Sequence, residues 1–270
     1  GYRIHTGVFA LEGEVNREFE WSFTHMRGTS GILPPEVNEF DLSIKFRYSD
    51  IIDSLTYKGE RSKFYFDTIA NHLNTFVLRD GVFTDSLESL LRDEFDNKGI
   101  PYSHKNDDGY NYASYLLTFV QETVTYAADI KLYGINEYWA FPTETIMRGY
   151  GDCEDTAFLC AALFKAAGFD TAMGLLPGHA MAGVHLSDHT LEYPDNFDQG
   201  TVNHYLITEE IEGVKFYACE TTYGSQFRIG YTSITYEDED DNRGRLTEWM
   251  QGGEYYSEDR PYGFYLIKDD

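Results

Sequence analysis

The stretch "MRGYGDCEDTAFLCAALFKAAG", residues 147–168, places a cysteine between carboxylates, directly after a glycine-rich turn and before a run of small and apolar residues. From Asp152 to Ala167 the apolar residues recur with helical spacing. Gly168 is typical of the position just beyond the end of a helix. The sequence therefore predicts a buried helix over 152–167, with Cys153 in its first turn.

The segments around this helix predict a mixture of helices and strands, and thus an α+β fold. Upstream, apolar residues at helical spacing favour helices, and alternation of apolar and polar residues favours a strand at 40–48. Downstream the pattern is that of strands, and "YGFYLIKD" at 262–269 is expected to close or edge a sheet. We expect a hairpin or two short strands within 2–26, helices near 62–78, 84–97 and 110–128, and strands at 171–176, 179–186, 189–193, 203–208 and 214–222, with a turn at Glu212-Gly213.

Composition excludes several classes of function. The chain has 270 residues and a formal net charge of −25. Nucleic acids are bound through clustered Lys and Arg, so a nucleic-acid partner is excluded. No run of about 18 apolar residues is present, so we predict no membrane contact. Three cysteines are too few for a disulfide framework. The abrupt start at Gly1 raises the hypothesis that a leader or anchor has been removed before Tyr2.

Cys153 stands where a thiol can act as a nucleophile. The first turn of a helix offers free N–H groups and the positive end of the helix dipole, both of which favour a thiolate. Gly149 and Gly151 would let a substrate carbonyl approach the amide of Cys153, which is half of an oxyanion hole. The neighbouring acids should raise the pKa of the thiol. We interpret Asp152 and Asp155 as helix-capping residues.

A base and an orienting acid are expected downstream. His179 begins a strand of small residues, whereas His185 on the same face lies about 20 Å further along, so only one of them can reach the cysteine. Glu220 shares a strand face with Phe216 and Ala218, where an unpaired carboxylate is costly. A histidine partner would explain its position. The alternative is that Glu220 lies beyond the edge of the core, in water.

These residues resemble the transglutaminase-like superfamily of papain-related cysteine enzymes. The resemblance rests on Gly-Asp-Cys-Glu-Asp at 151–155, on the Gly-His strand at 178–179 and on Glu-Thr-Thr at 220–222, and is greatest for prokaryotic and archaeal members. It implies a thiol nucleophile at Cys153, a general base at His179 and an orienting acid at Glu220. It also implies a papain-like core in which the cysteine helix packs on an antiparallel sheet.

The resemblance covers about 110–225 and suggests a division of the chain. Residues 106–270 would form the catalytic domain, and 1–105 an N-terminal α/β extension packed on it. The second oxyanion donor would be the amide of Gln121 or the indole N–H of Trp139, although either could be a core residue without a catalytic role. Family members are often exported, which favours an exported or membrane-anchored domain over a cytoplasmic one.

The function expected from these features is acyl transfer at an amide or peptide bond of a peptide or protein substrate. Hydrolysis and transamidation share the thioester step and remain open. The alternative is a catalytically weak domain for binding or scaffolding on a cell surface. A metal site built from Cys153, His179, His185 or Glu220 is the weakest hypothesis, and no cofactor or metal is predicted. The run "EDEDD" at 237–241 lacks the spacing of a calcium loop and is interpreted as a solvated loop.

Overall fold

A computed structural model describes the chain in several segments. These are residues 13–25, 36–61, 69–102, 106–176, 178–187, 189, 205–206, 208–222, 228–232 and 263–268. They fold into a mixed α/β structure whose strand pairings are mostly antiparallel. Buried apolar residues from Phe19 to Ile267 belong to one hydrophobic cluster, so both ends of the described chain contribute to the same core.

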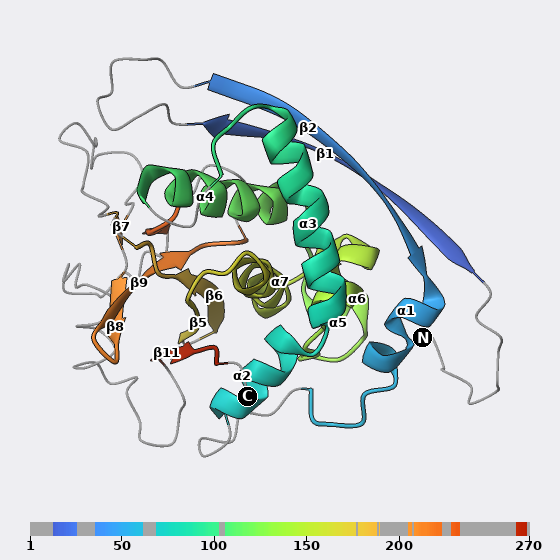
Figure 1. Cartoon of the computed structure of the whole chain (residues 1–270). Coiled ribbons are helices and arrows are strands. Elements are labelled where there is room, and N and C mark those ends of the chain that lie inside the picture. Colours follow the sequence, from blue (N-terminus) through green and yellow to red (C-terminus); the bar gives the residue numbers. More distant parts are fainter. Residues whose placement is uncertain are drawn as a thin grey trace.

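A long two-stranded ribbon covers one side of the molecule. β1 (Glu14–His25) pairs antiparallel with β2 (Glu36–Arg47) over their whole lengths. Alternate residues of β2 are buried from Phe40 to Phe46, as expected for a strand with one face on the core. The inner face packs on α3 (Gly81–Asn97) and α4 (Asn106–Thr123). Figure 1 shows the ribbon lying across these two helices.

The helix predicted from the opening stretch is the central element. α7 (Cys153–Ala166) is buried on nearly all sides and contacts α2 (Ile69–Leu78), α3, α4 and α6 (Pro142–Arg148). Gly168 follows it with φ 85°, which confirms the predicted helix end. In Figure 1 the helix is seen along its axis, between the other helices and a sheet.

The sheet is five-stranded, antiparallel and ordered β11-β5-β6-β9-β8. α7 packs on β5 and β6. The predicted turn at Glu212-Gly213 is confirmed, with both residues at positive φ. The prediction that 262–269 closes or edges a sheet is also confirmed, because β11 is the edge strand beside β5. The strands are β5 (Thr171–Leu176), β6 (His179–Val184), β8 (Thr208–Ile211), β9 (Val214–Cys219) and β11 (Gly263–Leu266), and a separate short pair joins β7 (Tyr205–Leu206) to β10 (Tyr231–Thr232).

Short elements connect α4 to α7. β3 (Thr125–Tyr126) runs parallel to β4 (Tyr150–Gly151), and the amides of Thr125 and Ala127 donate to the carbonyls of Gly149 and Gly151, both at 2.9 Å. Between these strands lie α5 (Asp129–Leu132) and α6, while α1 (Tyr48–Leu55) follows β2. Among the described residues, no helix is long and apolar enough to cross a membrane.

Several predicted elements were wrong in detail. Residues 14–25 form a strand within 2–26, as predicted, but their pairing with 36–47 was not predicted. The helix predicted at 110–128 spans 106–123, since the backbone beyond it pairs with β4. In α3, Leu87 and Leu91 are buried, but Leu90 between them is 42% exposed. Residues 2–12, 62–68, 190–193 and 237–241 lie outside the described chain, so the predictions made for them are not addressed.

Candidate active site

The turn before Cys153 has a local structural explanation. Gly149 ends α6 with φ 70°, a backbone conformation that favours glycine. At Gly151 a Cβ atom would lie 2.7 Å from the Cβ of Asp155 and 3.2 Å from Thr145. The first glycine therefore terminates one helix, and the second makes room for a buried acid of the next. Both are explained without a substrate.

Cys153 is the first residue of α7 and is half-buried. Its thiol donates a hydrogen bond to Oε2 of Glu154, at 3.2 Å. Burial and then the charges of Glu154 and Asp152 raise the pKa of the thiol well above its usual range, while the backbone amide of Ala180 acts in the opposite direction. The resting side chain is therefore a protonated thiol.

His179 and Glu220 form the contact predicted between a base and an orienting acid. Nε2 of His179 lies 2.8 Å from Oε2 of Glu220. The Glu220 side chain is fully buried and that of His179 is 15% exposed. Glu220 therefore does not lie in water beyond the core. Because Nε2 faces the carboxylate, Nδ1 is the ring nitrogen that can turn toward a thiol.

Both threonines of the Glu-Thr-Thr sequence hold Glu220 in place. The amide and hydroxyl of Thr222 donate to Oε1 of Glu220 at 2.9 and 2.6 Å. The hydroxyl of Thr221 lies 2.8 Å from that of Thr156, in the first turns of α7. Burial alone would raise the pKa of Glu220, but hydrogen bonds and charge from His179, together with Thr222, lower it below its ordinary value. The carboxylate is thus fixed as an anion.

The two candidate oxyanion donors lie in different places. The side-chain amide of Gln121 donates to the backbone carbonyl of Glu220 at 2.7 Å, so α4 contributes to the site. This bond uses one of the two amide hydrogens. The indole N–H of Trp139 donates to Glu137 at 2.9 Å, and its ring packs in the core against Phe158. Among the predicted residues, the structure brings Gln121 to Glu220 and places Trp139 elsewhere.

The remaining histidine on β6's face is also placed apart. Nδ1 of His185 lies 2.8 Å from the carbonyl of Lys215, and its ring is near Phe216. His185 follows the end of β6, whereas His179 begins that strand. This agrees with the prediction that only one of them can serve Cys153.

The capping interpretation of Asp152 and Asp155 is confirmed in position, at the N-cap and in the first turn of α7, but not in hydrogen bonding. Asp152 occupies the N-cap position of α7, but its side chain makes no capping hydrogen bond. Asp155 is fully buried and accepts a bond from the amide of Ala140, at 2.7 Å. The side chains of both acids are therefore buried in the interior. The sequence pattern predicted instead that they would cap the end of the helix.

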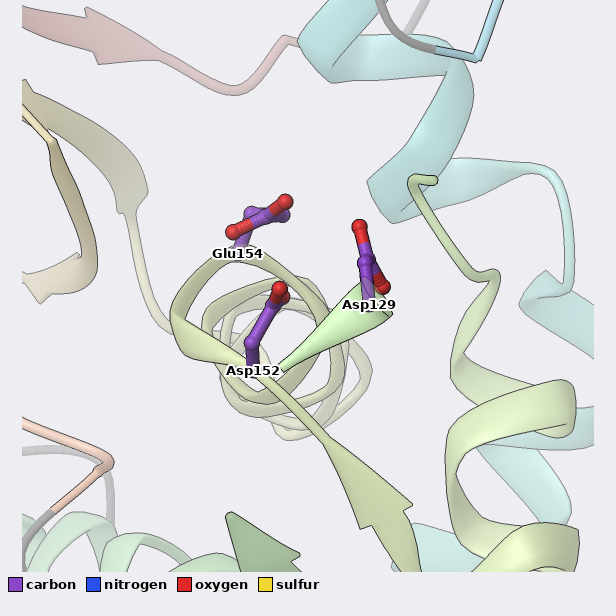
Figure 2. A group of neighbouring side chains, drawn as sticks. All are labelled: Asp129, Asp152 and Glu154. Carbon is purple, nitrogen blue, oxygen red and sulfur yellow. The ribbon is translucent and has the colours of Figure 1, made fainter. Parts of the chain in front are cut away.

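Asp152 belongs to a group of three buried acids that does not include Asp155. Ligand oxygens of Asp129, Asp152 and Glu154 all lie within 4.8 Å of one another, and Figure 2 shows the three carboxylates grouped beside the first turn of α7. Burial is the main cause that raises the pKa of Asp129 to about 7 and of Glu154 to about 11. Sequence reasoning missed this group because Asp129 lies far from the cysteine motif. Residues 125–127, just before Asp129, pair with 149–151 through backbone hydrogen bonds, and the sequence does not show this pairing.

Comparison with known proteins identifies no protein-family model and no curated protein that matches the chain.

Proposed function

We propose that the protein is a thiol-dependent acyl-transfer enzyme acting on an amide or peptide bond, with Cys153 as nucleophile, His179 as general base and Glu220 as orienting acid. The observation that carries this proposal is the buried bond between His179 and Glu220 at the start of β6, the strand on which α7 and its first residue Cys153 pack. A base fixed by a carboxylate beside a thiol at a helix start is an arrangement suited to nucleophilic catalysis.

The reaction would proceed in two balanced steps. His179 takes the thiol proton as the sulfur attacks the substrate carbonyl, and then gives that proton to the leaving amine as the C–N bond breaks. A thioester on Cys153 remains. Water or a second amine, deprotonated by His179, then attacks the thioester and releases the thiol. Glu220 stays ionised throughout and stabilises the imidazolium.

The papain-like arrangement is part of the same proposal. Its support is that the helix beginning with the thiol packs on β6, which begins with His179, and that Glu220 directly follows β9, the antiparallel neighbour of β6, so the chain order is Cys, His, acid. The candidates for an oxyanion hole are the amide of Cys153 and the side chain of Gln121, which is bonded to the backbone of Glu220. The proposal of a peptide or protein substrate rests on the resemblance of the sequence motifs and not on the shape of the site.

The experiment is acylation by an activated ester. Wild-type protein is mixed with p-nitrophenyl acetate, and the acetylated residue is located by mass spectrometry. We expect acetyl on Cys153, its loss on incubation, and a rate of p-nitrophenol release on the order of 10²-fold lower in His179→Ala.

Cys160→Ser is the matched control, because Cys160 lies on the same helix and is fully buried. It should leave the rate unchanged. Equal acetylation of Cys153 in wild type and in His179→Ala would contradict the proposed role of the histidine.

One observation favours a second candidate, a catalytically weak binding domain. The Cys153 thiol donates to Glu154, and the nearby acids raise its pKa. Because burial and the carboxylates of Glu154 and Asp152 keep the thiol protonated, the site suits binding better than catalytic turnover. Absence of any acetyl-Cys153 in the ester experiment would favour this candidate.

A further inference from the structure

α4 carries a polar stripe on a helix that is otherwise mostly apolar and buried. The stripe consists of Asn111, Ser114, Thr118 and Gln121, which follow one another at spacings of three or four residues and therefore share one face of the helix. All four side chains are more than nine-tenths buried. Buried polar groups are costly unless they meet polar partners. This face of α4 therefore needs polar surroundings.

A small pocket lies beside the stripe. Asn111, Ser114 and Thr118 line it from α4, residues 22–24 line it from β1, and Arg228 contributes the charged group. Its volume is about 130 Å³. That is the space of roughly four water molecules and lies well below the range of sites for whole small molecules. The pocket therefore has room for one side chain of a larger ligand.

The wall that β1 forms is a strand edge. Successive side chains of a strand point to opposite faces, so a pocket lined by three consecutive residues, 22–24, meets the strand at its edge. Among the described strands, β1 pairs only with β2. Its other edge presents backbone N–H and C=O groups, with which an extended peptide can pair. A peptide therefore suits this wall.

The chemistry of the pocket suits a carboxylate. Its lining contains Arg228 and several hydroxyl groups but no Asp or Glu among the described residues. Burial raises the pKa of the Tyr110 phenol, while the charge of Arg228 and then the hydroxyl of Ser114 lower it, so these three groups lie near one another. A guanidinium beside hydroxyl donors forms strong hydrogen bonds to an anionic oxygen. The pocket is thus a local exception in a chain of net charge −25.

The pocket is tied to the proposed active site on two sides. Its α4 wall ends one turn before Gln121, whose side-chain amide donates to the carbonyl of Glu220. The segment that begins with Arg228 returns to β9, where the amide of Gly230 donates to the carbonyl of Ala218 at 2.6 Å. Both walls are therefore fixed to the strand end that carries the orienting acid.

We propose that this pocket is a substrate subsite that takes the side chain of an aspartate or glutamate in an extended peptide. Arg228 would pair with the carboxylate, and the free edge of β1 would hold the peptide backbone. Along α4 the pocket extends from about 5 Å to about 16 Å from Gln121, at 1.5 Å per residue. At about 3.3 Å per peptide residue, the acidic residue would lie within about five positions of the reacting amide bond.

This inference rests on the proposed acyl-transfer function, and its test measures binding without turnover. Fluorescein-labelled libraries of nonapeptides carry Glu or Gln at one defined position and a mixture of residues elsewhere. Each library is titrated with Cys153→Ala protein by fluorescence polarisation, at about 0.15 M salt to screen the acidic surface. We expect Glu to bind at least about fivefold more tightly than Gln at one or two adjacent positions. At the other positions Glu should give no gain, because the net charge of the protein repels an anion. No preference for Glu at any position would overturn the proposal.

Variants of single arginines assign the preference to the pocket. Arg228→Gln in the same background should remove the preference for Glu and leave the affinity for the Gln library unchanged. Arg47→Gln is the matched control, because Arg47 is an exposed arginine at the end of β2 that does not line the pocket. It should keep the full preference. A preference that survives Arg228→Gln, or that Arg47→Gln also removes, would contradict the role of Arg228.

Sodium glutarate tests whether the pocket instead holds a free small anion. We expect it to displace the Glu library only at millimolar concentration, because it lacks a backbone that can pair with β1. Equal affinity of glutarate and the Glu library would overturn the assignment to a peptide. Failure of the two proposals can be distinguished: acetylated Cys153 without a Glu preference overturns the subsite alone. A Glu preference that depends on Arg228, without any acetylation of Cys153, supports the peptide pocket and contradicts the acyl-transfer activity.

Discussion

At the scale of single residues, the candidate site depends on how Glu220 is held. Its two oxygens receive bonds from His179 and from Thr222, its carbonyl from Gln121, and its neighbour Thr221 contacts Thr156. The sequence predicted the partner of Glu220, because an acid on an apolar strand face needs one. It could not predict the contacts of the two threonines, whose roles depend on how α7 meets the end of β9.

The lowered pKa of Glu220 predicts a pH dependence of stability. Folding favours the ionised carboxylate, so its contribution is complete above the ordinary value of 4.5 and is lost as pH falls through the lower folded value. Glu220→Gln should therefore destabilise the protein more at pH 7 than in acid. Urea unfolding of both proteins from pH 7 to 3 measures this, and a constant difference in unfolding free energy would contradict it.

Glycine positions show where residue patterns mislead. Gly149 and Gly151 suggested an open approach for a substrate, but the first has the φ of a helix end and the second is packed against Asp155. The sequence alone cannot distinguish a glycine that admits a substrate from one that the local backbone or packing requires. The φ angle of Gly149 and the packing of Gly151 make that distinction.

At the scale of elements, α6 is fixed by a buried ion pair that sequence reasoning did not find. Arg61 donates to Oε2 of Glu144 at 2.9 Å and to the carbonyl of Trp139 at 2.7 Å. Glu144 also accepts from the amide of Phe141, at the start of α6. The arginine lies 83 positions before the glutamate, so no local pattern links them.

Removal of Arg61 should destabilise the protein strongly. Arg61→Met leaves the buried Glu144 carboxylate without its closest cation, which costs about 3 kcal/mol. Arg61→Met combined with Glu144→Gln should recover part of this loss, since the orphaned charge is gone. Urea denaturation measures both proteins, and a double variant no more stable than the single one would contradict an ionic role.

The sequence predicted whether a segment is a helix or a strand where its apolar residues follow one regular spacing over most of its length. α7, β5, β6 and β9 follow from their apolar pattern. The end of α4 did not follow, because Thr125 leaves the helix to pair with Gly149. That pairing also brings Asp129 toward the start of α7, so the same long-range contact explains both the missed helix end and the missed group of acids.

At the scale of the whole molecule, the β1–β2 ribbon is part of the core. The ring of Trp21 stacks on Phe40 with centroids 5.4 Å apart and meets Phe119 of α4 edge-on at 5.0 Å. The sequence predicted strands here and an extension packed on the core. It did not predict that β1, a strand of 12 residues, pairs with β2 along its whole length.

Trp21→Ala should test the ribbon's contribution. The side chain is 3% exposed, so its removal leaves a cavity that costs about 3–5 kcal/mol. Val37→Ala on β2 is the matched control, because this side chain is 59% exposed and its loss should change stability by less than about 0.5 kcal/mol. Similar small effects of both substitutions on thermal unfolding would show that the ribbon contributes little to the fold.

The central claim, that Cys153 is activated by His179, is tested most directly by alkylation. Wild type and His179→Ala are treated with iodoacetamide at one pH near neutral, and the labelled cysteine is located by mass spectrometry. The account predicts that Cys153 is labelled well before the fully buried Cys160 and Cys219, and that its rate falls on the order of tenfold or more in the variant. Labelling of Cys153 at the same rate in both proteins would contradict it.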